Sequence, residues 1–122
     1  MPLVRNADSK SLRAIAQETA RLAQGAREGS LTHEEVTGST FSVSNLGMYG
    51  IDVFTPIVNP PEIAILGIGR INEKLVRVSR GAEWHHMMTL SLTFDHRAID
   101  GAPAAAFLQT LGNHLGHPEG LT

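Results

Sequence analysis

The apolar run at residues 62–69, which follows directly on Asn59-Pro60-Pro61, limits the possible folds more than any other feature of the sequence. Two consecutive prolines cannot lie inside a central strand, because proline donates no hydrogen bond to a neighbouring strand. A strand must therefore begin after them. Nearly every residue of the run is apolar, which is typical of a strand covered on both faces. The run predicts a buried strand that needs neighbours.

Two amphipathic helices flank a region of short strands. The first is predicted from a cap at Asp8 or Ser9 to about Glu28-Gly29, and the second from Asp100 or Gly101 to about residue 115. Alternating residues predict strands at 40–44, 74–79 and 84–94, and the end of a further strand at 3–6. This order predicts an α+β fold, a two-layer sandwich of mixed sheet and helices in which the sheet is incomplete.

Composition and charge argue against several classes of function. The net charge is −2 and the cationic residues are scattered, which argues against a nucleic-acid partner. No apolar run approaches the ~20 residues of a membrane span. Cysteine is absent, and neighbouring residues of a strand point to opposite faces, so the pair His85-His86 is a poor chelate and no metal is expected. The first residues show no secretory signal; we expect the cytoplasm, or the mitochondrial matrix in a eukaryote.

The segment at residues 90–101 carries the clearest sign of chemistry. A predicted strand ends in Asp95-His96-Arg97, and a short loop then opens the second helix. A histidine at the end of a packed strand has a fixed backbone and an accessible ring, which suits a general base. Asp100 follows four residues later, where a carboxylate is favoured by the helix dipole. On spacing alone this is weak evidence for catalysis, because an isolated histidine or aspartate near a helix start is more often a cap or a satisfied polar group.

Four segments in order resemble signature stretches of the dihydrolipoyl acyltransferases of 2-oxo acid dehydrogenase complexes. Residues 95–101 match DHRxxDG, and residues 38–47 are similar to GGTFTxSNLG. Residues 54–62 are similar to FTPIINPPE, and residues 4–12 to VIRDADxKSL. The similarity runs from about residue 3 to residue 115. Four linked motifs are far more specific than the spacing of one histidine and one aspartate.

The resemblance implies the fold of the chloramphenicol-acetyltransferase-like, CoA-dependent acyltransferases, here only its C-terminal half. It also implies transfer of an acyl group between dihydrolipoamide and coenzyme A. His96 would deprotonate the attacking thiol, and Ser44 would donate a hydrogen bond to the oxyanion, with Ser42 as its rival. Asp100 would hold the loop that orients His96, and Arg97 would pair with a nearby carboxylate or the backbone.

The same resemblance implies partners. In the family the catalytic domain is a trimer in which histidine and serine come from neighbouring subunits, and trimers form cores of about 24 or 60 subunits. The lipoyl group is supplied by a separate domain, and the decarboxylase and dihydrolipoamide dehydrogenase components complete the complex. Residues 44–51 look closer to the acetyl-transferring members, so an acetyl group is expected.

A complete catalytic domain of this family is about twice as long as this chain and follows lipoyl and peripheral subunit-binding domains. Residues 1–122 are therefore expected to be a partial catalytic domain without those other domains. Two alternatives stay open. One is a catalytically inactive oligomerisation or core-assembly module, which would cover the exposed sheet edge of a half-domain. The other is an acyltransferase of the chloramphenicol acetyltransferase type. The motif of that type is HHxxxDG, whereas this chain has Asp95 in place of the first histidine, directly before His96.

Overall fold

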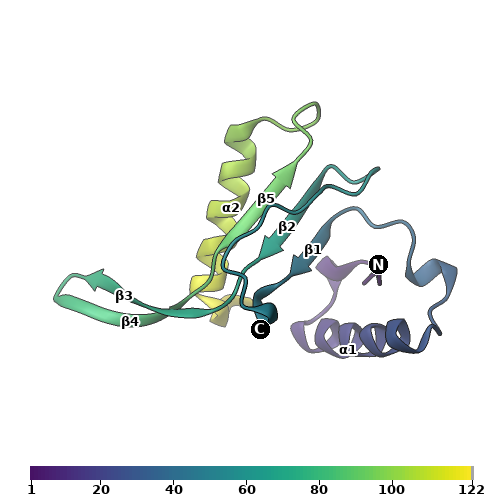
Figure 1. Cartoon of the computed structure of the whole chain (residues 1–122), viewed down its shortest axis with the longest axis horizontal. Coiled ribbons are helices and arrows are strands. Elements are labelled where there is room, and N and C mark those ends of the chain that lie inside the picture. The colour runs from purple at the N-terminus through teal and green to yellow at the C-terminus, as the bar shows by residue number, and fades with distance from the viewer. Residues whose placement is uncertain (122) are drawn as a thin grey trace. The chain divides into compact units, whose positions relative to one another are not determined.

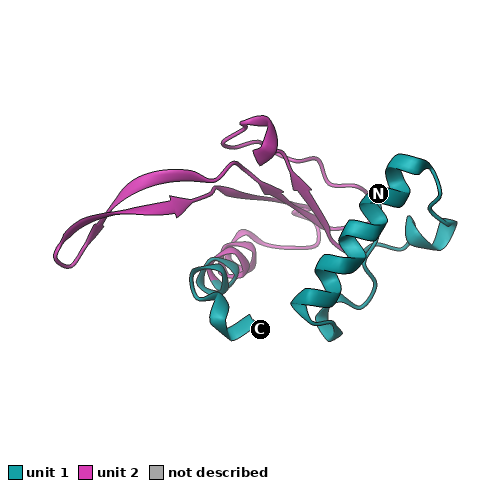
Figure 2. Ribbon diagram, turned by 90° about the horizontal axis from the view of Figure 1, so that it is seen from below, with its two compact units in different colours: residues 1–40, 110–122 teal, residues 41–109 magenta. Residues whose placement is uncertain are grey.

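The computed structural model of the chain describes residues 1–121 and contains two compact units (Figure 2). Unit 1 comprises residues 1–40 and 110–122, and unit 2 comprises residues 41–109. The helices and strands are α1 (Leu12–Glu28), β1 (Ser42–Asn45), β2 (Ala64–Ile68), β3 (Asn72–Val78), β4 (Gly81–Met87), β5 (Leu90–Phe94) and α2 (Gly101–Gly116). Short 3₁₀ turns are η1 (Ala7–Ser9), η2 (His33–Glu35), η3 (Gly47–Tyr49) and η4 (Pro118–Leu121). The expected α+β class is confirmed.

The first predicted helix is α1 of unit 1. It ends where the sequence predicts, because Gly29 adopts a left-handed conformation (φ 68°) and donates its N–H to the Gly25 carbonyl. The predicted N-cap at Asp8 or Ser9 is wrong. Those residues form η1, and the cap is Ser11, whose hydroxyl accepts a hydrogen bond from Ala14 N at 3.2 Å. Leu22, 2 % exposed, is buried on the helix.

The strand end predicted at residues 3–6 is also wrong. Leu3 N donates to the Glu35 carbonyl at 2.9 Å, but Asn6 then turns into the left-handed region (φ 50°) and leads into η1. Glu35 closes a capping box with Thr32 and pairs with Arg21 at 2.7 Å. A single backbone hydrogen bond before a tight turn does not form a strand. The apolar residues 3–4 resemble the end of a strand only in the sequence.

Unit 2 is built on a three-stranded sheet in the order β1-β2-β5 (Figure 1). β2 is the central strand that the apolar run predicts: Ala64, Ile65 and Leu66 are each 5–6 % exposed. It pairs in parallel with β1 and antiparallel with β5. On one face the ring of Phe107, from α2, lies 5.8 Å from that of Phe41.

The predicted strand at 84–94 is two strands. β4 pairs with β3 in an antiparallel hairpin and ends at Met87, whereas β5 begins at Leu90 and pairs with β2. Thr89, between them, accepts a hydrogen bond from Gly69 N at 2.9 Å. Met88 and Thr89 belong to neither strand, and the sequence has no proline or glycine there to mark the break. Among the described residues, no helix is both long and apolar enough to cross a membrane.

Candidate active site

Ser44 lies near the end of β1, on a row of small residues that crosses the sheet. It is paired with Gly67 of β2, which is paired in turn with Ser91 of β5. Residues paired in register present their side chains on the same face. A Cβ on Gly67 would lie 3.0 Å from the Phe54 ring and 3.2 Å from Pro56 Cδ, so the chain at residues 54–56 covers this face beside Ser44.

Ser42, the rival of Ser44, is engaged elsewhere. It is 4 % exposed, and its hydroxyl donates a hydrogen bond of 2.9 Å to the buried carboxylate of Glu62. Ser44 is half-buried, and none of the residues 1–121 holds its hydroxyl in a hydrogen bond. The two serines share a strand and a face but differ in what their hydroxyls can do. Only that of Ser44 is available to a ligand.

His96 lies in the loop after β5, and Asp95 holds that loop. Asp95 N donates to the Ile63 carbonyl at 2.8 Å, and its own carbonyl accepts from Ala98 N and Ile99 N. Its carboxylate accepts from Arg97 Nε at 2.9 Å, from Arg97 Nη2 at 2.6 Å and from Arg97 N at 2.9 Å. The Arg97 guanidinium and backbone N–H lower the pKa of the Asp95 carboxyl to about 2. The expected pairing of Arg97 with a nearby carboxylate is confirmed.

Asp95 is therefore the residue that sequence reasoning missed. The spacing of the DHR motif could have identified it, because a carboxylate two residues before an arginine can close a turn around the residue between them.

Asp100 makes no hydrogen bond to His96. The distance between His96 Nδ1 and Asp100 Oδ1 is 3.8 Å, too long for a hydrogen bond, and both side chains are largely exposed. The His96 ring also lies 5.7 Å from the Phe94 ring.

A single chain does not bring Ser44 and His96 together. Ser44 is level with Ser91, and β5 continues from Ser91 to Phe94 over ~10 Å before His96 follows. Two strand spacings add ~10 Å across the sheet. The arrows of β1 and β5 point to opposite ends of the sheet in Figure 1. The base and the hydroxyl donor thus lie toward opposite ends of the three-stranded sheet.

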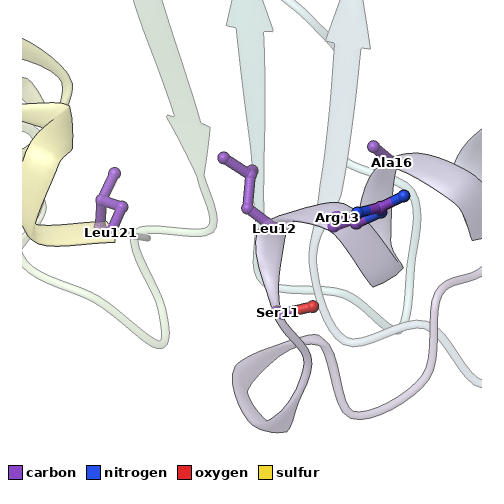
Figure 3. A pocket seen from close by; sticks show the side chains of 5 residues that line it. All are labelled: Ser11, Leu12, Arg13, Ala16 and Leu121. Carbon is purple, nitrogen blue, oxygen red and sulfur yellow. The ribbon is translucent and has the colours of Figure 1, made fainter.

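The rest of the described chain has fewer features of a catalytic or metal-binding site. No group of three or more potential metal-ligating side chains is found within residues 1–121. An apolar hollow of about 440 Å³ lies in unit 1, where Leu12 and Leu121 face it from opposite sides (Figure 3). Ser11, Arg13 and Ala16 complete its lining. It contains none of the predicted catalytic residues.

The whole chain, residues 1–122, matches the family model described as 2-oxoacid dehydrogenases acyltransferase (catalytic domain). Over 99 % of the chain it is 48 % identical to a Bacillus subtilis dihydrolipoyllysine-residue acetyltransferase component of the acetoin cleaving system, of which it covers 30 %. Over 97 % it is 45 % identical to a Pseudomonas aeruginosa lipoamide acyltransferase component of the branched-chain alpha-keto acid dehydrogenase complex, of which it covers 28 %.

Solved structures agree. The dihydrolipoamide acetyltransferase of Azotobacter vinelandii superposes with a TM-score of 0.93 at 42 % identity, over 98 % of this chain and 49 % of that one. A structure of the cubic core of the pyruvate dehydrogenase multienzyme complex gives the same TM-score, identity and coverage. The chain thus spans 28–30 % of the length of these curated relatives and 49 % of these solved chains. It belongs to the 2-oxoacid dehydrogenase acyltransferase family and matches that family's catalytic domain.

Proposed function

We propose that this chain transfers an acetyl group between dihydrolipoamide and coenzyme A, with His96 as the base and Ser44 as the oxyanion donor. One observation carries the proposal. In the Azotobacter vinelandii enzyme, the serine, histidine and asparagine whose catalytic roles were investigated are separated by 52 and 4 positions. Ser44, His96 and Asp100 have the same separations here. Aspartate in place of asparagine at the third position keeps an oxygen that can accept a hydrogen bond.

In this proposal His96 takes the proton of the attacking thiol, because a free thiol is only a few per cent ionised at neutral pH. The sulfur then adds to the thioester carbonyl, and the carbonyl oxygen acquires a negative charge. The Ser44 hydroxyl donates a hydrogen bond to that oxygen. Collapse of the intermediate expels the other sulfur, which recovers the proton from His96. The products are one new thioester and one free thiol.

The separation of Ser44 and His96 supports a site shared between two chains. The hydroxyl end of one sheet would face the histidine end of another, as expected for a trimer of the chloramphenicol-acetyltransferase-like fold. Further assembly into a core is supported by the likeness to the cubic core of the pyruvate dehydrogenase complex. A lipoyl domain would deliver dihydrolipoamide, and decarboxylase and dihydrolipoamide dehydrogenase components would act before and after the transfer. No metal takes part, and we propose the cytoplasm or mitochondrial matrix as its location.

The acyl group is proposed from two features. Residues 44–51 look closer to the acetyl-transferring members, and the acetoin-system relative at 48 % identity is an acetyltransferase. The branched-chain relative is 45 % identical, so competition among acetyl-CoA, isobutyryl-CoA and succinyl-CoA is the direct comparison. The highest kcat/KM for acetyl-CoA would support the proposed acetyl group. A higher kcat/KM for another acyl-CoA would contradict it and identify that acyl group as the preferred one.

The test is transfer from acetyl-CoA to dihydrolipoamide by the purified protein, followed as thioester formation. Ser44→Ala should lower kcat on the order of 10²–10³-fold, as is typical of losing one oxyanion donor. His96→Ala should lower it at least as far. Ser42→Ala is the matched control: it removes a hydroxyl from the same strand face and should reduce stability more than kcat. An unaltered protein that assembles but transfers nothing would instead support the core-assembly module.

Mixing the two inactive variants tests whether the site is shared. A chain with Ser44→Ala still carries His96, and a chain with His96→Ala still carries Ser44. In randomly mixed oligomers, about a quarter of the sites would combine both intact residues. Regained activity after co-refolding would support the shared site. No recovery in mixed oligomers of normal size would contradict it.

A further inference from the structure

The loop that follows Ser44, residues 46–52, is exposed and largely apolar. Met48 is 80 % exposed and Tyr49 is 74 % exposed. Burial of these side chains therefore cannot hold the loop in place. Yet the loop begins two residues after Ser44, so its position affects the direction of the Ser44 hydroxyl. Another interaction must fix it.

The backbone of the loop lies directly against the segment that leaves β2. Leu46 N donates to the Ile68 carbonyl at 3.2 Å, and Arg70 N donates to the Ile51 carbonyl at 2.8 Å. Glycines permit this approach: a Cβ on Gly69 would lie 2.0 Å from the Asp52 carbonyl oxygen, and one on Gly47 would lie 2.8 Å from the Gly69 carbonyl oxygen. The two segments leave no room for side chains between them.

Side chains at the far end of the loop join the same two segments. Asp52 Oδ1 accepts from Arg70 Nε at 2.8 Å, and Asp52 Oδ2 accepts from Arg70 Nη2 at 2.9 Å. Asn72 Nδ2 adds a third hydrogen bond to Asp52 Oδ1 at 2.7 Å. These contacts lower the pKa of the Asp52 carboxyl, chiefly through the hydrogen bonds from Arg70. The carboxylate is therefore ionised throughout the neutral range.

An exposed ion pair contributes little to global stability, because water screens it. A bidentate arginine–carboxylate pair does, however, fix orientation, since both hydrogen bonds must form in one plane. Here it closes a loop whose other end begins two residues after the proposed oxyanion donor, Ser44. Its expected effect is on geometry rather than on the free energy of unfolding.

We propose that Asp52 and Arg70 are positioning residues for Ser44: their ion pair fixes residues 46–52 against the end of β2 and thereby the direction of the Ser44 hydroxyl. This inference rests on the proposed function, in which that hydroxyl stabilises the oxyanion. It assigns to Asp52 no contact with substrate. The pair acts only through the loop, and its loss should weaken transition-state binding rather than ground-state binding.

The test is Asp52→Asn in two backgrounds, assayed as acetyl transfer to dihydrolipoamide well below the thermal midpoint of each variant. With Ser44 intact, kcat should fall on the order of tenfold or more, as small misplacements of a catalytic group do. KM should stay within about twofold. In the Ser44→Ala background the same substitution should change the residual kcat by less than about twofold, because the hydroxyl that it positions is gone.

The matched control is Glu83→Gln, which removes the charge of another exposed carboxylate of unit 2, one that lies 3.5 Å from His85 Nε2, and should leave kcat unchanged. Arg70→Met should reproduce the loss seen with Asp52→Asn. An unchanged kcat in Asp52→Asn, or an equal fold loss in both backgrounds, would overturn the inference while leaving the proposed function intact. Full activity in Ser44→Ala, or no transfer by the unaltered protein, would overturn both.

Discussion

The three-stranded sheet and the β3–β4 hairpin of unit 2 differ in how their strands are held: the sheet has the shorter strands, of 4 or 5 residues, and the hairpin has strands of 7 residues. In the sheet, β2 is buried from Ala64 to Gly67. In the hairpin every residue of β4 is exposed; Trp84 is 69 % exposed, and Leu75, opposite it on β3, is 59 % exposed. The sheet joins segments far apart in the sequence, whereas the hairpin joins neighbours.

The difference shows that pairing and burial are separate sources of order. A hairpin closes a short loop at small entropic cost, so hydrogen bonds and cross-strand contacts can define it. Joining β1 to β2 closes a much longer loop, and the buried apolar side chains of β2 offset that cost. Substitutions in the two regions should therefore have unequal effects.

The largest difference is expected between two leucine truncations. Leu66→Ala removes a side chain that is 6 % exposed in the central strand and should lower the free energy of unfolding by about 2–5 kcal/mol. Leu75→Ala on the hairpin should cost less than about 1 kcal/mol, as exposed substitutions usually do. Urea denaturation of both variants measures the difference. An equal loss would mean that the hairpin face is covered in the folded protein.

A smaller difference is expected between two glycines. Gly69→Ala forces a Cβ against the Asp52 carbonyl oxygen, so backbone must move, at a cost of about 1–3 kcal/mol. Gly81→Ala at the hairpin turn meets nothing within 4 Å and has only the strain of a positive φ (109°), about 1 kcal/mol. Thermal unfolding compares them. A larger loss for Gly81→Ala would contradict the close approach at Gly69.

The smallest effect concerns the charge at the end of β5. The pKa of Asp95 is lowered from 3.8 to about 2 in the folded chain, so its ion pair with Arg97 stabilises the fold above pH ~4 and is lost as the pH falls toward 2. Arg97→Met should raise the pKa of Asp95 back toward 3.8, which an NMR titration of the carboxyl carbon measures. Arg80→Met, at the hairpin turn, is the control and should leave it unchanged.

Much of the site was predictable because its residues lie in short sequence motifs. His96, Arg97 and Asp100 lie within one motif, and Ser44 lies in another. The role of Asp95 was missed although it lies in the same motif, since its bonds to Arg97 depend on the turn that it forms. The choice between Ser42 and Ser44 could not be made from alternation, because both point to one face; the contact of Ser42 with Glu62 distinguishes them.

The sequence by itself determined the family, the buried strand β2, both helices and the residues that carry the proposed chemistry, because each depends on local composition and period. The tertiary structure decided where β4 ends and β5 begins, and that Ser44 and His96 lie at opposite ends of one sheet. It also decided that Asp52 meets Arg70. These features depend on which distant segments pair and in what register, and no local pattern contains that information.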